Sequence, residues 1–113
     1  MTKLNKVVAI QFLKGKDEKD HPQIHLYRNP DGKKGQAIYK FNNPTSITAE
    51  DFNSIHRMYL NDEEGELSTR KIDLSISDDK TTMEVKSTYN WSSKEEFERF
   101  MRFAERYANS ITK

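Results

Sequence analysis

Apolar and polar residues alternate in short runs along most of this chain, and turn residues interrupt the runs. In residues 69–77, Ile72, Leu74 and Ile76 occupy every second position, with polar residues between them. Successive side chains of a β-strand point to opposite faces, so this pattern places the three apolar residues on one face. A strand with one apolar and one polar face is typical of an antiparallel sheet that is buried on one side.

Six runs are strand candidates, namely residues 7–13, 23–28, 36–41, 57–60, 69–77 and 82–91. Segments rich in Asn, Pro, Asp or Gly separate them and predict turns, at residues 29–32, 42–44, 62–65 and 78–80. In the second run, Ile24 and Leu26 share one face, whereas His25 and Tyr27 share the other. The charged loop 15–21 is followed by Pro22, and we expect no regular element in it.

Two helices are predicted. A short helix covers residues 49–55, with Thr48 as its N-cap and acidic residues in its first turn. A longer helix covers residues 94–109, because Ser92 and Ser93 each precede a Glu by three positions, which is the capping-box pattern. Apolar residues then recur at helical spacing, at Phe97, Phe100, Met101, Ala104 and Ala108. We expect this helix to pack on the sheet face that carries Ile72, Leu74, Val85 and Tyr89.

These elements predict the α+β class, with a single domain over residues 1–113. We expect one antiparallel sheet of about five to six strands, a short middle helix and a C-terminal helix packed on the sheet. The length of 113 residues supports one core and excludes a large multi-layer enzyme. Only 34% of the residues are apolar, but six Phe, five Tyr and one Trp supply enough large rings for a compact core.

The sequence contains no signature of catalysis or of metal binding. It has no Cys, which excludes a disulfide framework, a zinc–thiolate site and a thiol nucleophile. The acidic run 62–66 lacks the spacing of a calcium loop, and His21 and His25 lie on a loop and a strand, too far apart to chelate one ion. We therefore expect a binding protein without cofactor. No apolar run is long enough to cross a membrane, so direct insertion into lipid is not expected.

Local charge patches are the remaining candidates for binding, because 19 basic residues nearly balance 18 acidic ones. One basic group lies in the first loop and the first hairpin turn, and it comprises Lys14, Lys16, Lys19, Arg28, Lys33 and Lys34. Such a group suits an acidic or phosphate-bearing partner. With Tyr27 and Tyr39 as stacking surfaces it also supports an alternative function, a small domain that binds RNA or anions.

A second basic group lies on the predicted C-terminal helix. At 100° per residue, Arg99, Arg102 and Arg106 form one stripe. It lies opposite Phe97, Phe100 and Ala104. Glu95 and Glu98 precede Arg99 and Arg102 by four positions, so the stripe also has an ordinary interpretation as a solvated face with local ion pairs.

Three stretches carry a resemblance to a known family. The first is Ile10-Gln11-Phe12 followed by Gly15, and the second is Met58-Tyr59-Leu60 with the acidic run 62–66 and Arg70. The third covers residues 99–108, which read Arg-Phe-Met-Arg-Phe-Ala-Glu-Arg-Tyr-Ala. In this order they resemble the Psb28 family of photosystem II. The chain departs from the family pattern in its leading residues 1–6, its Lys-rich first loop and its turn at 78–80, which is typical of a divergent second copy.

The resemblance implies a peripheral, monomeric protein on the cytoplasmic (stromal) face of the thylakoid membrane. It implies transient binding to photosystem II intermediates during assembly or repair, through the larger inner-antenna chlorophyll protein and loops of the reaction-centre core. A secondary implication is help in supplying chlorophyll to antenna proteins. Together with the basic patches, it gives the candidate partner-binding residues Lys14, Lys16, Arg28, Lys33, Lys34, Glu63, Arg99 and Arg102. Nucleic acid is not an expected partner.

Overall fold

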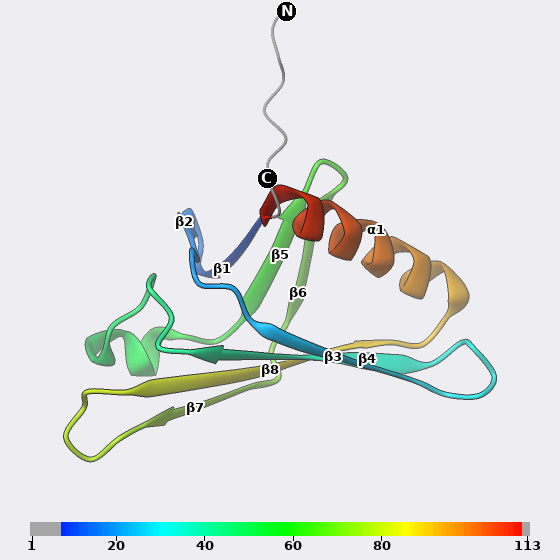
Figure 1. Ribbon diagram of the computed structural model, residues 1–113. Coiled ribbons are helices and arrows are strands. Elements are labelled where there is room, and N and C mark those ends of the chain that lie inside the picture. Colours follow the sequence, from blue (N-terminus) through cyan, green and yellow to red (C-terminus); the bar gives the residue numbers. More distant parts are fainter. Residues whose placement is uncertain (1–7, 112–113) are drawn as a thin grey trace, which may run out of the picture.

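The computed structural model describes residues 8–111, which form eight strands, one 3₁₀ helix and one α-helix (Figure 1). In chain order these are β1 (Ala9–Leu13), β2 (Lys16–Asp17), β3 (Gln23–Arg28), β4 (Gly35–Asn42), η1 (Ala49–Ser54), β5 (Met58–Asp62), β6 (Gly65–Thr69), β7 (Ile72–Ile76), β8 (Met83–Trp91) and α1 (Lys94–Ile111). The α+β class is confirmed. The predicted extension 1–6, and the first residue of the predicted strand 7–13, lie outside the described residues.

The strands form two antiparallel sheets instead of the single sheet that we predicted. The first sheet has the strand order β2-β1-β5-β6, and the second has the order β3-β4-β8-β7. The predicted strand 69–77 is in fact the end of β6 in the first sheet and all of β7 in the second. Strand β6 was not predicted because Gly65–Thr69 lacks apolar alternation. It pairs with β5 through backbone hydrogen bonds, after a turn in which Gly65 has a φ of 124°.

Two smaller differences concern the loop 15–21 and the middle helix. The loop contains the two-residue strand β2, which pairs with β1 across a tight turn in which Gly15 has a φ of 89°. Backbone pairing of this kind needs no apolar side chains, so the charged sequence did not prevent it. The middle helix is a 3₁₀ helix over Ala49–Ser54, and the Asp51 carboxylate accepts the Thr48 N–H at 2.8 Å, as a capping residue does.

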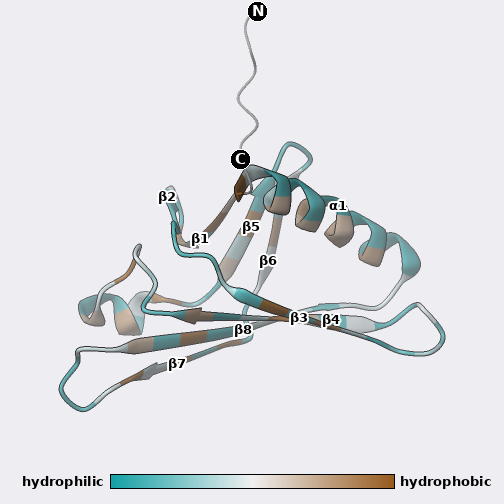
Figure 2. Cartoon of the chain, viewed as in Figure 1, coloured by the Kyte–Doolittle hydropathy of each residue, from teal (hydrophilic) through white to brown (hydrophobic). Residues whose placement is uncertain are grey.

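Helix α1 covers the core formed by both sheets. Figure 1 shows it running from the end of β8 back to the upper end of β5, and Figure 2 shows its hydrophilic residues on the side away from the sheets. Its start agrees with the predicted capping pattern, because Ser93 Oγ accepts the Glu96 N–H at 3.1 Å and the Glu96 carboxylate accepts the Ser92 N–H at 2.7 Å. The helix therefore begins where the sequence predicted.

The buried face of α1 is centred differently from the prediction. Phe100, Phe103 and Tyr107 are buried, whereas the predicted core residue Ala108 is exposed. Phe97, Met101 and Ala104 are half-buried at the margin of the core. The ring of Phe100 stacks on Tyr89 with centroids 5.3 Å apart and on Trp91 at 5.2 Å. The buried residues of α1 belong to one core cluster that includes Leu60 of the first sheet and Val85 of the second, so the position of the helix over both sheets sets its buried face.

Candidate functional site

Strand β3 presents an open edge. It pairs only with β4, and all six of its residues are exposed, including Ile24 at 39%, Leu26 at 46% and Tyr27 at 53%. The other edge strands are shorter, with two residues in β2 and five each in β6 and β7. Apolar side chains on a free edge are uncommon, because such an edge attracts further strands. Strand β3 is therefore the best candidate for strand pairing with a partner.

The register identifies which backbone groups of β3 point outward. The Asn29 N–H donates to the Lys34 carbonyl at 2.9 Å, and this pair continues the β3–β4 register. Hydrogen-bonded and non-bonded pairs alternate in an antiparallel ladder, so Tyr27, His25 and Gln23 bond to β4. The N–H and carbonyl groups of Ile24, Leu26 and Arg28 consequently face away from the sheet and are available to an added strand.

The β3–β4 turn carries three of the predicted binding residues. The Asp31 carboxylate accepts the N–H of Lys33 at 2.8 Å and that of Lys34 at 3.5 Å, and these hydrogen bonds lower the pKa of Asp31. The Arg28 guanidinium lies 4.1 Å from the centre of the Phe97 ring, which anchors it to α1 by a cation–π contact. Lys33 and Lys34 are exposed. Two of the three cations are thus free to meet a partner beside the open edge.

The structure does not bring the predicted basic group together. Lys14 and Lys16 lie at the β1–β2 turn of the first sheet, and Figure 1 shows this turn well apart from the β3–β4 turn. Lys14 forms an ion pair with Glu66 at 3.5 Å and lies over the Tyr59 ring. Tyr39, which the RNA-binding alternative needed as a stacking surface, is fully buried. The basic residues therefore form separate patches.

The arginines of α1 bind the acidic β5–β6 turn, which corrects the prediction of a solvated stripe with local ion pairs. Arg99 donates two hydrogen bonds to Asp62, at 2.8 and 2.9 Å, and Arg106 donates another at 2.9 Å. Arg102 donates to Glu64 at 2.6 and 2.9 Å. We call these five residues the arginine–carboxylate cluster. Glu63 lies at its edge, with its carboxylate 3.6 Å from Arg106.

The arginine–carboxylate cluster is strong enough to keep its charges across the physiological range. Burial by itself raises the pKa of Asp62, but hydrogen bonds from Arg99 and Arg106 outweigh burial and lower it overall. Hydrogen bonds from Arg102 and Arg106 lower the pKa of Glu64 to about 2. The Asp62 side chain is fully buried, and Arg99 is only 17% exposed. A partner that contacts Arg99 or Arg102 has to share them with this turn.

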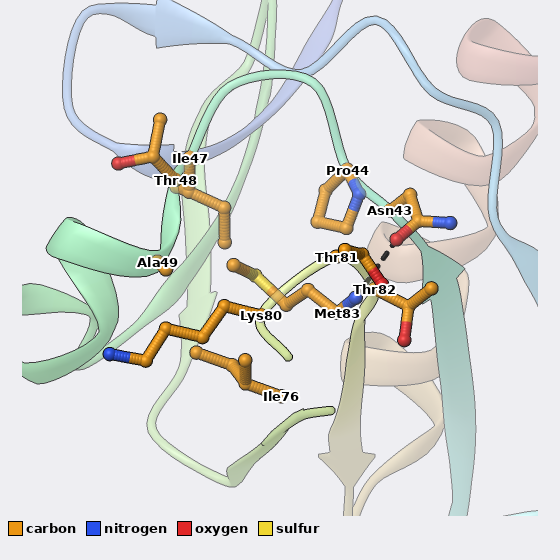
Figure 3. A pocket seen from close by; sticks show the side chains of 10 residues that line it. All are labelled: Asn43, Pro44, Ile47, Thr48, Ala49, Ile76, Lys80, Thr81, Thr82 and Met83. Carbon is orange, nitrogen blue, oxygen red and sulfur yellow. Dashed lines mark hydrogen bonds between the residues drawn. The ribbon is translucent and has the colours of Figure 1, made fainter. Parts of the chain in front are cut away.

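The described pockets offer no catalytic arrangement. The pocket in Figure 3 lies between η1 and the β7–β8 turn, has a volume of about 180 Å³, and is lined by apolar side chains such as Ile47, Ile76 and Met83 together with threonines. Within residues 8–111, no group of three His, Asp or Glu side chains is placed to hold a metal ion. No helix in that range is long and apolar enough to span a membrane.

Sequence reasoning missed one basic pocket. It lies at the link between β6 and β7 and is lined by Arg57, Arg70 and Lys71. Arg70 belongs to the second family motif, but none of the three was a candidate binding residue. Arg57 precedes β5, whereas the other two residues follow β6. The pairing of Met58 with Thr69 across these strands brings the flanking cations to the same end of the hairpin. No local motif signals this arrangement.

Comparison with known proteins identifies the family. The model of the Psb28 protein family matches residues 10–112. The Psb28 protein of the photosystem II reaction centre from Prochlorococcus marinus strain NATL2A is 65% identical over 99% of this chain and 98% of its own length. The protein of the same name from Synechococcus sp. strain WH7803 is 44% identical over 90% of this chain and 78% of its own length. Psb28 is not an enzyme family, which confirms the expectation of a non-catalytic protein. The resemblance in the sequence is therefore confirmed, and the chain belongs to the Psb28 family.

Proposed function

We propose that this chain is a non-catalytic assembly and repair factor that binds transiently to photosystem II intermediates. It acts as a monomer on the cytoplasmic face of the thylakoid membrane, and its partners are the larger inner-antenna chlorophyll protein and loops of the reaction-centre core. The names of its relatives, which refer to the photosystem II reaction centre, support the association with this complex. Its secondary role is to assist chlorophyll–protein biogenesis.

The exposed edge of β3 is the observation that best supports a binding role. A partner segment in extended conformation pairs with the outward backbone groups of Ile24, Leu26 and Arg28 and so becomes a fifth strand of the second sheet. The exposed side chains of Ile24 and Leu26 supply apolar contact area on one face of that added strand. Backbone pairing provides affinity, and the side chains provide selectivity.

The cations of the β3–β4 turn steer the partner to this edge. Lys33 and Lys34 are exposed and have no ion pair within residues 8–111. Exposed charges near an interface act mainly on the rate of association. Lys33→Glu combined with Lys34→Glu is therefore expected to slow association about tenfold at low salt and to change the dissociation rate little. Stopped-flow or surface-based binding kinetics, with the chain and an isolated photosystem II complex, measures the association rate and the dissociation rate.

Capture from solubilised thylakoids tests the proposal. The tagged wild-type chain is expected to retain photosystem II subunits, which mass spectrometry then identifies. Leu26→Pro removes an outward N–H without breaking a β3–β4 hydrogen bond, so it should abolish capture and leave the fold intact. Leu26→Ala is the matched control, because it keeps the N–H and removes only the side chain. Amide exchange should show new protection at Ile24, Leu26 and Arg28 in the complex.

Two outcomes contradict the proposal. If the wild-type chain retains no photosystem II subunit, the assignment to this complex is wrong. If capture succeeds but Leu26→Pro binds as well as Leu26→Ala, strand addition at β3 is wrong. Retention on RNA with steep salt dependence supports the alternative of a small RNA- or anion-binding domain, although the burial of Tyr39 removes one of its two stacking surfaces.

A further inference from the structure

A basic pocket lies where the chain passes from the first sheet to the second. It has a volume of about 320 Å³ and is lined by Arg57, Ser68, Thr69, Arg70, Lys71, Tyr89 and Asn90. These residues come from the segment before β5, the end of β6, the β6–β7 link and the end of β8. Figure 1 shows the lower end of β6 meeting β7 and β8 at this point. The pocket is thus built by both sheets.

The three cations of the pocket have no carboxylate partner within residues 8–111. None of the ion pairs in this range involves Arg57, Arg70 or Lys71, and no acidic side chain lines the pocket. Arg57 donates one hydrogen bond, at 3.2 Å, to the Ser68 hydroxyl. The arginines of α1 differ, because each is bound to a carboxylate of the β5–β6 turn. The pocket therefore concentrates positive charge that the described chain leaves uncompensated.

The backbone that carries these cations is held in place. Thr69 Oγ1 donates to the Thr88 carbonyl at 2.6 Å and accepts the Lys71 N–H at 3.1 Å. The Thr88 N–H donates to the Lys71 carbonyl at 3.0 Å. Tyr89 forms a wall that is fixed by its stacking on Phe100. A ligand consequently meets a preformed backbone and has to order only the cationic side chains, which lowers the entropy loss on binding.

We propose that this pocket binds carboxylates of an acidic segment in a protein partner. Guanidinium groups match carboxylates in a two-bond geometry, and Arg99 makes such a pair with Asp62 in this same chain. Many phosphate sites use a helix N-terminus, and no helix residue lines this pocket. The choice of a protein partner rests on the function proposed above.

The pocket is separate from the open edge of β3. Strands β4 and β8 lie between β3 and β7 in the second sheet, and the pocket adjoins β8 and the β6–β7 link. One photosystem II intermediate can therefore occupy both surfaces, with an extended segment at β3 and an acidic segment at the pocket. Two contacts on one rigid domain raise the effective affinity beyond that of either one.

Binding of a synthetic peptide tests the pocket directly. The probe is a labelled ten-residue peptide of alternating Glu and Ser, with a Gln-for-Glu analogue, and anisotropy is measured with the full chain at low salt. Arg70→Gln combined with Lys71→Gln should weaken binding at least tenfold. Lys86→Gln combined with Lys94→Gln removes the same charge from exposed positions outside the pocket and should change binding less than threefold. Equal weakening by both pairs, or equal binding of the Gln analogue, overturns the proposal.

Chemical-shift mapping locates the bound peptide and separates carboxylate from phosphate. The acidic peptide should shift the amides of residues 68–71 and 89–90. Inorganic phosphate, at matched ionic strength, should shift them less. If the peptide shifts other amides instead, or if phosphate alone shifts these, the assignment of a carboxylate site is wrong. Arg70 and Lys71 are exposed, so their substitution should leave the spectrum of the core unchanged.

Capture from thylakoids distinguishes this inference from the proposed function. If the wild-type chain retains photosystem II subunits and the Arg70→Gln, Lys71→Gln variant retains clearly fewer than the Lys86→Gln, Lys94→Gln control, the inference is supported. If both variants retain as much as the wild type, the inference is wrong and the proposed function stands. If the wild type retains none, the proposed function fails, and with it the assignment of the pocket to a photosystem II partner.

Discussion

Replacement of Asp62 by Asn should strongly destabilise this protein, because the buried Asp62 carboxylate is the centre of the arginine–carboxylate cluster. The Asp62 carboxylate accepts two hydrogen bonds from Arg99, one from Arg106 and one from the Glu64 N–H at 2.9 Å. An Asn side chain keeps one acceptor oxygen and turns an NH₂ group toward the guanidinium groups. It also leaves Arg99, which is 17% exposed, with only the more distant Glu64 carboxylate, at 3.7 Å, as a counter-charge. Breaking a buried ion pair in this way costs about 3 to 5 kcal/mol.

Urea unfolding measures the effect. With a denaturant slope of about 1.5 kcal/mol/M, the expected loss lowers the midpoint by about 2 to 3 M. Asp73→Asn is the matched control, because it makes the same chemical change on an exposed residue of β7 and should cost less than about 0.5 kcal/mol. Arg99→Gln should cost clearly less in the Asp62→Asn background than in the wild type, since the two residues act on each other.

The contribution of Asp62 to the stability of the fold should depend on pH in a defined direction. The folded state lowers the pKa of Asp62, so its stabilising contribution is present above the ordinary pKa of an aspartate and is lost as pH falls through the folded-state value. The gap in stability between the wild type and Asp62→Asn should therefore be full at pH 7 and should shrink below about pH 4. If the gap is the same at both pH values, or if Asp62→Asn and Asp73→Asn cost the same, the ionic account of this cluster is refuted.

Three further predictions concern the core, a buried acid and the membrane. Phe100→Ala should lower the free energy of unfolding by about 3 to 5 kcal/mol, because Phe100 is fully buried among Tyr39, Tyr89 and Trp91. Arg102→Ala, on the exposed side of α1, should cost clearly less in the same urea melts. Glu18→Gln should cost about 2 kcal/mol or more. Glu18 is buried, and burial by itself raises its pKa, but hydrogen bonds from Ser46, Thr45 and Asp20 lower the pKa overall. The loss of stability in Glu18→Gln should therefore be present at pH 7. It should disappear in acid-unfolding curves as pH falls through the folded-state pKa of Glu18. Finally, the chain should not float with protein-free anionic liposomes at physiological salt, because the apolar face of α1 is buried in the core. Strong co-flotation would contradict the prediction that the chain associates with the membrane only through protein partners.

Several features of the fold could be predicted because they depend on neighbouring residues. The strand over residues 23–28, the start of α1 after Ser93 and the hairpin turn around Gly32 all follow from alternation, capping and turn preferences within a few positions. The turn at 78–80 also formed as predicted, with Lys80 at a φ of 62° and its neighbours held by the Asp79 carboxylate. The family resemblance likewise depends on short motifs.

The candidate site was only partly predictable. Lys33 and Lys34 were placed correctly on the β3–β4 turn, since they adjoin a strong turn signal. The sequence indicated that Ile24 and Leu26 share a face, but not that this face lies at an open edge. That information depends on which strand pairs with which. The pocket around Arg70 and Lys71 was missed for the same reason, because its third cation, Arg57, comes from the segment before β5.

The sequence by itself determined the local elements and the family of this protein, because periodicity, capping and motifs act over a few residues. The tertiary structure alone decided the division into two sheets, the buried face of α1 and the partners of its arginines. Arg99 and Asp62 are 37 residues apart, and their contact takes the place of the local Glu95–Arg99 pair that the helix sequence favoured. The physical reason is burial. A carboxylate removed from water at the β5–β6 turn requires a cation, and only the packing of α1 over β5 brings one within reach.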